Sequence, residues 1–252
     1  MQFASLGSGS KGNATLIRHG ETCLMLDCGF SLRETEQRLE RLGYGAETLT
    51  ALLLTHEHSD HIRGAGPLAR KYDLPVWGTR GTLAHPGLGR LPHTVPIDVH
   101  RALQIKTIQV QPYPVPHDAR EPCQFVFSAG EKRLGVLTDV GASTTHIEKV
   151  LSGCDALLLE CNHDEQMLAQ GPYPPSLKQR VGGNFGHLSN RQAADLLARL
   201  DNSRLRHLVI AHVSEQNNSS KLARQALSEV LQCEHDWVGI SLQQEGLDWR
   251  EL

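Results

Sequence analysis

Short apolar segments recur along the chain, and most of them end in polar or glycine-rich loops. Segments of this length, bounded by turn residues, are typical of buried β-strands. We therefore predict strands over residues 2–6, 14–18, 22–27, 51–54, 75–77, 103–116, 124–128, 133–137, 156–159, 207–211 and 238–242.

Between these strands, apolar residues recur at helical spacing. The pattern is clearest after Ser189, where one face would carry Ala193, Ala194, Leu196, Leu197 and Leu200. Further helices are predicted over 31–43, 65–72, 144–152 and 221–231. Ser31 and Ser189 are typical N-cap residues. The alternation of strands with helices favours the α/β class.

Residues 78–101 are rich in glycine, proline and histidine, and we expect an irregular segment there. It could serve as a lid or a substrate-contact loop. Pro172–Pro175 interrupts the pattern a second time, before a short basic patch at Lys178 and Arg180. No low-complexity linker separates the two halves of the chain, so we predict a single domain over 1–252.

Composition and charge narrow the function classes. Of the 252 residues, 39% are hydrophobic and 21% charged, as in ordinary globular proteins. The net charge of −3 gives no global basic field, so a polyanion would need a local groove or metal ions. The six cysteines form no Cys-x-x-Cys pair, which favours reduced thiols and a cytoplasmic protein. No apolar run could span a membrane, and no protein partner is identifiable.

The segment 55–61, Thr-His-Glu-His-Ser-Asp-His, directly follows the predicted strand 51–54. It brings His56, His58, Asp60 and His61 close together in the chain. Imidazole and carboxylate groups are common metal ligands, and a buried strand would hold them at a fixed edge. The segment therefore predicts a metal site rather than a solvated polar loop.

Three more potential ligands follow the ends of predicted strands: His117, Asp139 and His212. Strand ends of an α/β core meet at one edge, where sites usually form. The seven donors exceed the four that one tetrahedral zinc takes, so we predict two divalent ions with Asp139 as a bridge. Zinc, manganese and iron all suit such ligands.

Two further features lie near the predicted site. The glycine-serine loop 7–13 lacks the spacing of a P-loop but could approach the site closely, and it ends in Asn13. Asp27 ends a predicted strand, where it could form a turn or orient a metal ligand.

The order Thr-His-x-His-x-Asp-His, Pro-His, Thr-Asp-x-Gly and Ala-His resembles the metallo-β-lactamase superfamily. Further segments resemble its YycJ/WalJ/VicX group: 3–13, 115–119, 159–164, 186–190 and 211–218. The resemblance implies an αββα four-layer sandwich. It also implies one metal held by His56, His58 and His117, a second held by Asp60, His61 and His212, and Asp139 between them.

That group is associated with 5′→3′ exonuclease activity on DNA and with DNA repair. The resemblance thus implies a dinuclear phosphodiesterase in which Asp60 orients a metal-bridging hydroxide as nucleophile. Gly-His-Leu-Ser at 186–189 is similar to a stretch of ribonuclease Z, which implies that His187 contacts the phosphate or protonates the leaving oxygen. Asn13, Asn162 and His163 are candidates for substrate contact.

Two alternatives remain open from the sequence. The same metal core could hydrolyse a small molecule such as a thioester, a lactone or a cyclic phosphodiester. The chain could also be a regulatory module that binds metal without catalysis.

Overall fold

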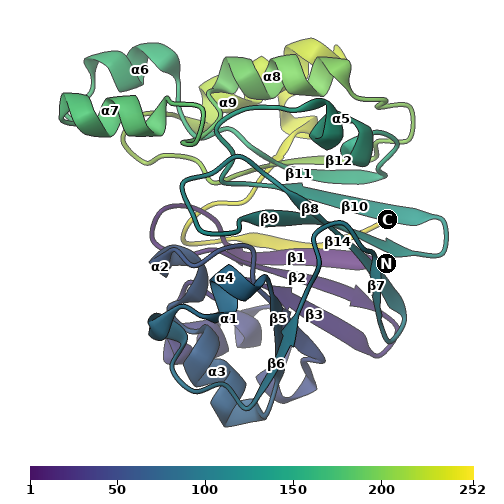
Figure 1. Cartoon of the computed structure of the whole chain (residues 1–252). Helices are drawn as coiled ribbons and strands as arrows, with labels where there is room; N and C mark the ends of the chain where they lie inside the picture. Colours follow the sequence, from purple (N-terminus) through teal and green to yellow (C-terminus); the bar gives the residue numbers. More distant parts are fainter.

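The computed structural model describes residues Met1–Leu252. Two seven-stranded sheets lie face to face, and helices cover the outer face of each (Figure 1). The resulting order of layers, helix–sheet–sheet–helix, confirms the predicted αββα sandwich. No helix is long and apolar enough to cross a membrane.

The first sheet has the strand order β14-β1-β2-β3-β4-β5-β6. Its pairs are antiparallel from β14 to β3 and parallel from β3 to β6. The strands are β1 (Gln2–Gly7), β2 (Ala14–His19), β3 (Thr22–Leu26), β4 (Ala51–Leu53), β5 (Pro75–Gly78), β6 (His93–Pro96) and β14 (Leu247–Glu251). On its outer side lie α1 (Leu32–Arg41), α2 (Ser59–Ile62), α3 (Ala65–Tyr72), α4 (Arg80–Leu83) and two short 3-10 turns, Ala46–Thr48 and Pro86–Leu88.

The second sheet has the order β13-β12-β11-β10-β9-β8-β7. It is antiparallel from β7 to β10 and parallel from β10 to β13. The strands are β7 (Leu103–Ile105), β8 (Ile108–Pro114), β9 (Cys123–Ala129), β10 (Lys132–Leu137), β11 (Ala156–Glu160), β12 (His207–Ala211) and β13 (Gly239–Ile240). Its helices are α5 (Thr145–Leu151), α6 (Glu165–Gln170), α7 (Pro175–Val181), α8 (Asn190–Arg199) and α9 (Ser220–Leu231), and His235–Trp237 forms a 3-10 turn.

Three groups of buried apolar side chains fill the spaces between the four layers. The central group joins both sheets and includes Phe3, Leu24, Phe125 and Leu158. One outer group packs the first sheet against α1 and α3, and the other packs the second sheet against α5, α8 and α9. Apolar burial on both faces of each sheet explains why so many strands read as continuous apolar runs.

The predicted helix starts are confirmed at both serines. The Ser31 side chain accepts a hydrogen bond from the Glu34 N–H. Ser189 forms a complete capping box with Gln192 at the start of α8. Each cap satisfies backbone N–H groups that have no partner within the helix.

Some expected elements differ in the structure. The strand predicted over 103–116 is a hairpin of β7 and β8, because Lys106 adopts a left-handed φ of 48°. The segment 78–101 is not irregular throughout, since it forms α4 and the edge strand β6. The C-terminal tail forms β14, which pairs with β1, and the last predicted strand is limited to Gly239–Ile240.

We predict that Phe125→Ala lowers the free energy of unfolding by about 3–5 kcal/mol, because Phe125 is fully buried between the sheets. Phe185→Ala is the matched control, since that side chain is 62% exposed, and we expect a change within about 0.5 kcal/mol. Urea denaturation followed by circular dichroism measures both. Equal losses in the two variants would contradict this account of the core.

Candidate metal centre

The strand directions bring the predicted ligands to one edge of the sandwich. β8, β10, β11 and β12 run in the same direction within the second sheet, so their carboxyl ends share an edge. β3 and β4 are parallel in the first sheet, and the segment 55–61 follows β4. The loops after these six strands hold every metal ligand predicted from the sequence.

Three residues that follow strands share an unusual backbone conformation. Asp27, Asp139 and His212 have φ angles of 60°, 53° and 52°. The left-handed region is sparsely populated by residues other than glycine, and such conformations cost about 1–3 kcal/mol. The three residues turn the chain just after β3, β10 and β12, at the edge that holds the predicted ligands.

The first predicted set of ligands lies together. His56, His58 and His117 each offer a ring nitrogen, and these atoms lie within 4.8 Å of one another. The His56 and His117 ring centroids are 4.9 Å apart. His56 and His117 are buried and His58 is half-buried, so the group opens toward solvent on one side only.

Hydrogen bonds behind this set fix the orientation of each ring. His117 Nδ1 donates to the Gly186 carbonyl at 3.0 Å, and His58 Nε2 donates to the Asp118 carbonyl at 3.2 Å. His56 Nδ1 lies 2.9 Å from Thr55 Oγ1, which itself donates to Asp27. The second nitrogen of each ring is thereby left facing the shared point, as in protein metal sites.

The remaining ligands surround Asp139. His61 Nε2 lies 3.2 Å from Asp139 Oδ2, and His212 Nδ1 lies 2.9 Å from Asp139 Oδ1. Asp60 Oδ2 lies 3.5 Å from His61 Nε2 and 3.8 Å from His212 Nε2. Asp139 Oδ1 also lies 4.0 Å from His117 Nε2, so this carboxylate reaches both sets.

These residues fit divalent ions. Three buried atoms at the centre, His56 Nε2, Asp139 Oδ2 and His212 Nδ1, form no hydrogen bond of acceptable geometry. An unpaired buried polar atom costs about 1–3 kcal/mol, which coordination of an ion would offset. Imidazole and carboxylate donors together suit zinc, manganese or iron.

Burial and charge shift the pKa values of these groups in opposite directions. Burial keeps the pKa of His56 well below its ordinary value. Burial also lowers the pKa of His212, but the Asp139 charge outweighs it and raises that pKa to about 9. Burial raises the pKa of Asp139, but the charges of His212 and His61 hold it well below its usual value. Asp139 is therefore ionised at neutral pH, as a metal ligand must be.

Asp27 holds a metal-facing histidine from behind. Its Oδ2 accepts from His61 Nδ1 at 2.8 Å, and its Oδ1 accepts from the Thr55 N–H at 2.9 Å. The carboxyl is 4% exposed in relative terms, and burial raises its pKa. Of the two roles open from the sequence, the observed contacts support orientation of a ligand.

Glu160 is a site residue that the sequence analysis missed. This fully buried carboxylate ends β11 and accepts hydrogen bonds from the Asp139 and Leu188 N–H groups and from His187 Nδ1, at 3.0, 2.9 and 2.9 Å. One oxygen of Glu160 groups with donor atoms of Asp139, His187 and His212 within 4.8 Å. A charged residue that directly ends a fully apolar strand, as in Leu-Leu-Leu-Glu, is the signal that could have revealed it.

A cavity of about 250 Å³ opens in front of the centre. His58, Asp60, Asp139, His187 and His212 line it, and Tyr173, Leu177, Arg180 and Val181, from α7 and the segment before it, line it as well. Arg180 pairs with Asp118, so it ties α7 to the loop that follows His117. The sequence indicated that Lys178 and Arg180 could line a phosphate groove, but it did not reveal α7 as a wall of the site.

The three predicted substrate contacts lie behind the cavity, and none is among its lining residues. The Asn13 amide bonds to Gly9 and approaches Asp60 Oδ2 at 3.3 Å. The Asn162 side chain donates to the His212 carbonyl, and His163 is 2% exposed beside Ser189. Their observed contacts support the ligand loops, and direct contact with substrate stays a prediction.

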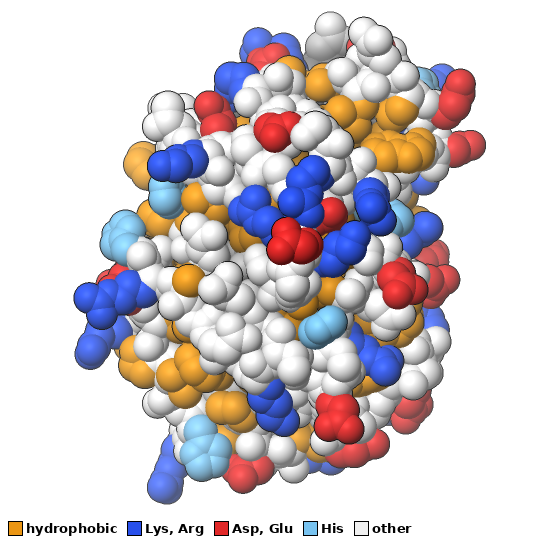
Figure 2. Space-filling view, turned by 90° about the vertical axis from the view of Figure 1, so that its right-hand side faces the viewer, with side chains coloured by type: hydrophobic (Ala, Val, Ile, Leu, Met, Phe, Trp, Pro, Cys, Tyr) orange, Lys and Arg blue, Asp and Glu red, His pale blue; other side chains and the backbone are white.

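The opposite end of the molecule, with the chain termini, carries mixed charge. Figure 2 shows lysine and arginine side chains gathered near the middle of this face, with acidic side chains among them. The metal centre lies at the other end, near α2 and α7 (Figure 1).

Residues 22–212 match the family model described as "Beta-lactamase superfamily domain". The chain belongs to this superfamily. It is 36% identical over 238 residues to the exodeoxyribonuclease YycJ of Bacillus anthracis, an alignment that covers 92% of this chain and 89% of that protein. It is 31% identical over 232 residues to the exodeoxyribonuclease WalJ of Streptococcus pneumoniae, covering 90% and 86%. The resemblance to the YycJ/WalJ group is therefore confirmed.

Solved structures agree with the fold. The metallo-β-lactamase fold protein YhfI from Bacillus subtilis superposes with a TM-score of 0.75 at 19% identity, over 99% of this chain and 98% of that one. Zn²⁺-bound PqqB from Methylobacterium extorquens superposes with a TM-score of 0.72 at 17% identity, over the whole of both chains.

We predict that Asp27→Asn weakens metal binding about 10–100-fold, because it removes the carboxylate that orients His61 and, through Thr55, His56. Competition with a chromogenic chelator for Zn²⁺ measures the affinity. Asp248→Asn is the matched control, since Asp248 is exposed on β14. An Asp27→Asn protein that folds and binds Zn²⁺ with unchanged affinity would exclude this role.

Proposed function

We propose that this protein is a metal-dependent phosphodiesterase that removes nucleotides from DNA in the 5′→3′ direction. The observation that carries the proposal is the meeting of two sets of metal-ligating side chains and His187 at one small cavity. Two nearly full-length relatives are named exodeoxyribonucleases, which supports DNA as the substrate. As part of the same proposal, the protein is a single cytoplasmic domain with a role in DNA repair.

Two divalent ions, zinc or manganese, would bind in this proposal. His56, His58 and His117 would hold one, and Asp60, His61 and His212 the other. Asp139 would bridge them, since its oxygens reach donors of both sets. Bound there, the ions would supply Lewis acidity toward the phosphate and toward a water molecule.

Asp60 can accept a proton on the solvent-facing side of the site. Its side chain is 20% exposed and lines the cavity, whereas that of Asp139 is 2% exposed. Asn13 Nδ2 and His61 Nε2 restrict its carboxylate on the inner side. Asp60 can therefore orient an attacking water and accept its proton while the inner carboxylate stays fixed.

His187 is placed to assist the leaving group. Its Nδ1 donates to Glu160 at 2.9 Å, which leaves Nε2 as the nitrogen free for a substrate. The ring lines the same cavity as Asp60, and its side chain is 20% exposed. With Nδ1 bonded to Glu160, a proton on Nε2 can pass to the leaving oxygen of a phosphodiester.

We predict that His187→Ala lowers kcat on 5′-phosphorylated duplex DNA about 10²–10⁴-fold, the range expected for a lost general acid. Metal content should stay near that of the wild type, because His187 belongs to neither proposed ligand set. End-labelled DNA and elemental analysis measure the two quantities. His146→Ala, on the exposed side of α5, is the control, and an unchanged rate for His187→Ala would refute the assignment.

We also predict that chelation with EDTA abolishes DNA hydrolysis and that added Mn²⁺ or Zn²⁺ restores it, since the cavity wall is built from metal ligands. Duplexes labelled at the 3′ end, with and without a 5′-phosphate, report the polarity of degradation. Activity that survives complete metal removal would contradict the proposal. Hydrolysis of bis(p-nitrophenyl) phosphate without DNA degradation would instead favour a small-molecule hydrolase.

A further inference from the structure

We propose that a groove beside the metal centre binds the phosphodiester backbone of the substrate strand where it leaves the catalytic cavity. This inference rests on the proposed function and deepens it. The groove has a volume of about 580 Å³, and its walls include Glu57, His58, Arg63, His85 and Arg120.

The groove continues the catalytic cavity. Both are lined by His58, so a chain that leaves the metal centre on that side enters the groove directly. Tyr173, Leu177 and Val181 line the cavity but not the groove. Its volume of about 250 Å³ lies below the roughly 300–1,000 Å³ of typical small-molecule sites. The cavity therefore accommodates one end of a strand, and the rest of the strand has to lie outside it.

The charge of the groove suits a polyanion. Arg63 and Arg120 are exposed, and neither guanidinium forms an ion pair, in contrast to Arg180, which pairs with Asp118. Glu57 is the one acidic residue in the walls, and its Oε1 already accepts the Arg120 N–H at 2.9 Å. Arginine is the usual partner of phosphate oxygens because its planar fork of donors matches them.

His85 adds a third donor. Its Nδ1 accepts the Gly87 N–H at 3.2 Å, so in the neutral ring the hydrogen lies on Nε2. His85 belongs to the segment 78–101, for which the sequence left open a contact with substrate. The structure thus places a donor from that segment in the same groove as His58 and Arg63.

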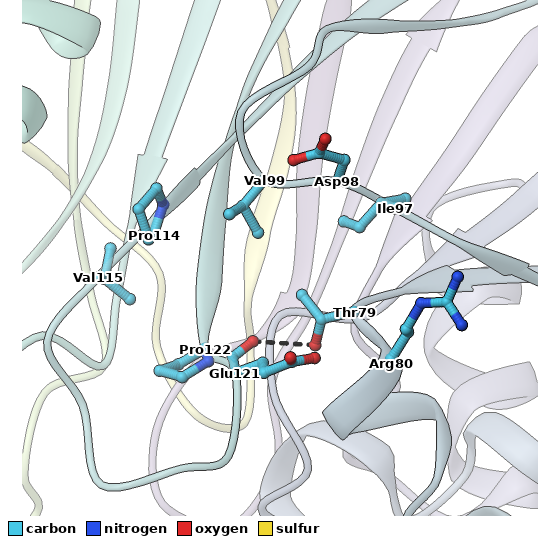
Figure 3. Close-up of a pocket in the computed structure, with 9 residues that line it drawn as sticks. All are labelled: Thr79, Arg80, Ile97, Asp98, Val99, Pro114, Val115, Glu121 and Pro122. Atoms are coloured by element: carbon cyan, nitrogen blue, oxygen red, sulfur yellow. Dashed lines mark hydrogen bonds between the residues drawn. The ribbon is translucent and has the colours of Figure 1, made fainter.

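The loop that carries Arg120 is held firmly. Thr79 Oγ1 donates to the Glu121 carbonyl at 2.9 Å (Figure 3), and Glu121 Oε2 accepts the Gly81 N–H at 2.6 Å. A cavity of about 350 Å³ lies beside these contacts, lined by Thr79, Glu121 and apolar residues that include Val99 and Val115 (Figure 3). Because the loop is fixed to α4, Arg120 keeps its position relative to the metal centre.

The test compares Arg63→Ala, Arg120→Ala and their combination with wild type. The matched control is Arg250→Ala, an exposed arginine without an ion pair on β14, on the far side of the molecule from α2 (Figure 1). Values of kcat/KM are measured on 5′-phosphorylated single-stranded DNA over a series of KCl concentrations. The kcat/KM of each preparation on bis(p-nitrophenyl) phosphate, a substrate too short to reach the groove, serves as the reference for the activity of its metal centre.

For the double variant, we expect the ratio of DNA to small-substrate kcat/KM to fall at least about ten-fold at low salt. The slope of log KM against log salt should fall by about 1.4, since each lost contact to a single strand removes about 0.7. Arg250→Ala should keep both values. A double variant with the wild-type ratio and slope overturns the groove and leaves the proposed function intact, whereas a wild-type protein that degrades no DNA overturns both.

Discussion

Two buried carboxylates hold histidines of the site from behind: Asp27, directly after β3 of the first sheet, and Glu160, at the end of β11 in the second. Asp27 accepts hydrogen bonds from Thr55 and His61 in the first sheet. Glu160 accepts from His187 and from the backbone of the Asp139 loop in the second. Burial of a carboxylate without hydrogen bonds costs several kcal/mol of folding free energy. The donors that each carboxylate needs come from loops of different strands, so satisfying it fixes those loops next to one another. The ligands meet between the sheets because each sheet supplies such a support.

The mixed sheets make this arrangement possible. In each sheet, neighbouring parallel strands place their carboxyl ends at the same edge of the sandwich. The loops that follow those strands therefore lie side by side. The left-handed residues Asp27, Asp139 and His212 then turn the chain immediately after the strand. Backbone strain there is offset by apolar burial on both faces of the sheets.

The positive charge that could attract a polyanion lies in one region of the surface and does not arise from the net charge of the protein. With a net charge of −3, the protein has no overall field that attracts a polyanion. The unpaired arginines Arg63 and Arg120 instead place positive charge in the groove that His58 shares with the cavity of the candidate metal centre. This arrangement links the chemistry of the centre to the position of a strand, because both depend on the loops after β4 and β8.

The sequence by itself determined the elements whose signal is local. Buried strands, the serine-capped helices and the ligands of the segment 55–61 could be predicted because each depends on neighbours in the chain. Motif order also gave the family and the proposed ligands His117, Asp139 and His212. These predictions needed no knowledge of which strands are adjacent.

Only the tertiary structure decided the features that depend on distant partners. In the sequence, Glu160 is an ordinary residue at the end of a strand. Its role becomes visible only in the structure, where it accepts hydrogen bonds from His187 and from the Asp139 N–H. The C-terminal tail becomes β14 only because β1 offers a free edge, and α7 becomes a wall only where it faces the metal centre. The hydrogen bonds from Asn13 to Asp60 and from Asn162 to the His212 carbonyl likewise could not be read from the sequence. A side chain's partner across two sheets is set by packing, which no local pattern encodes.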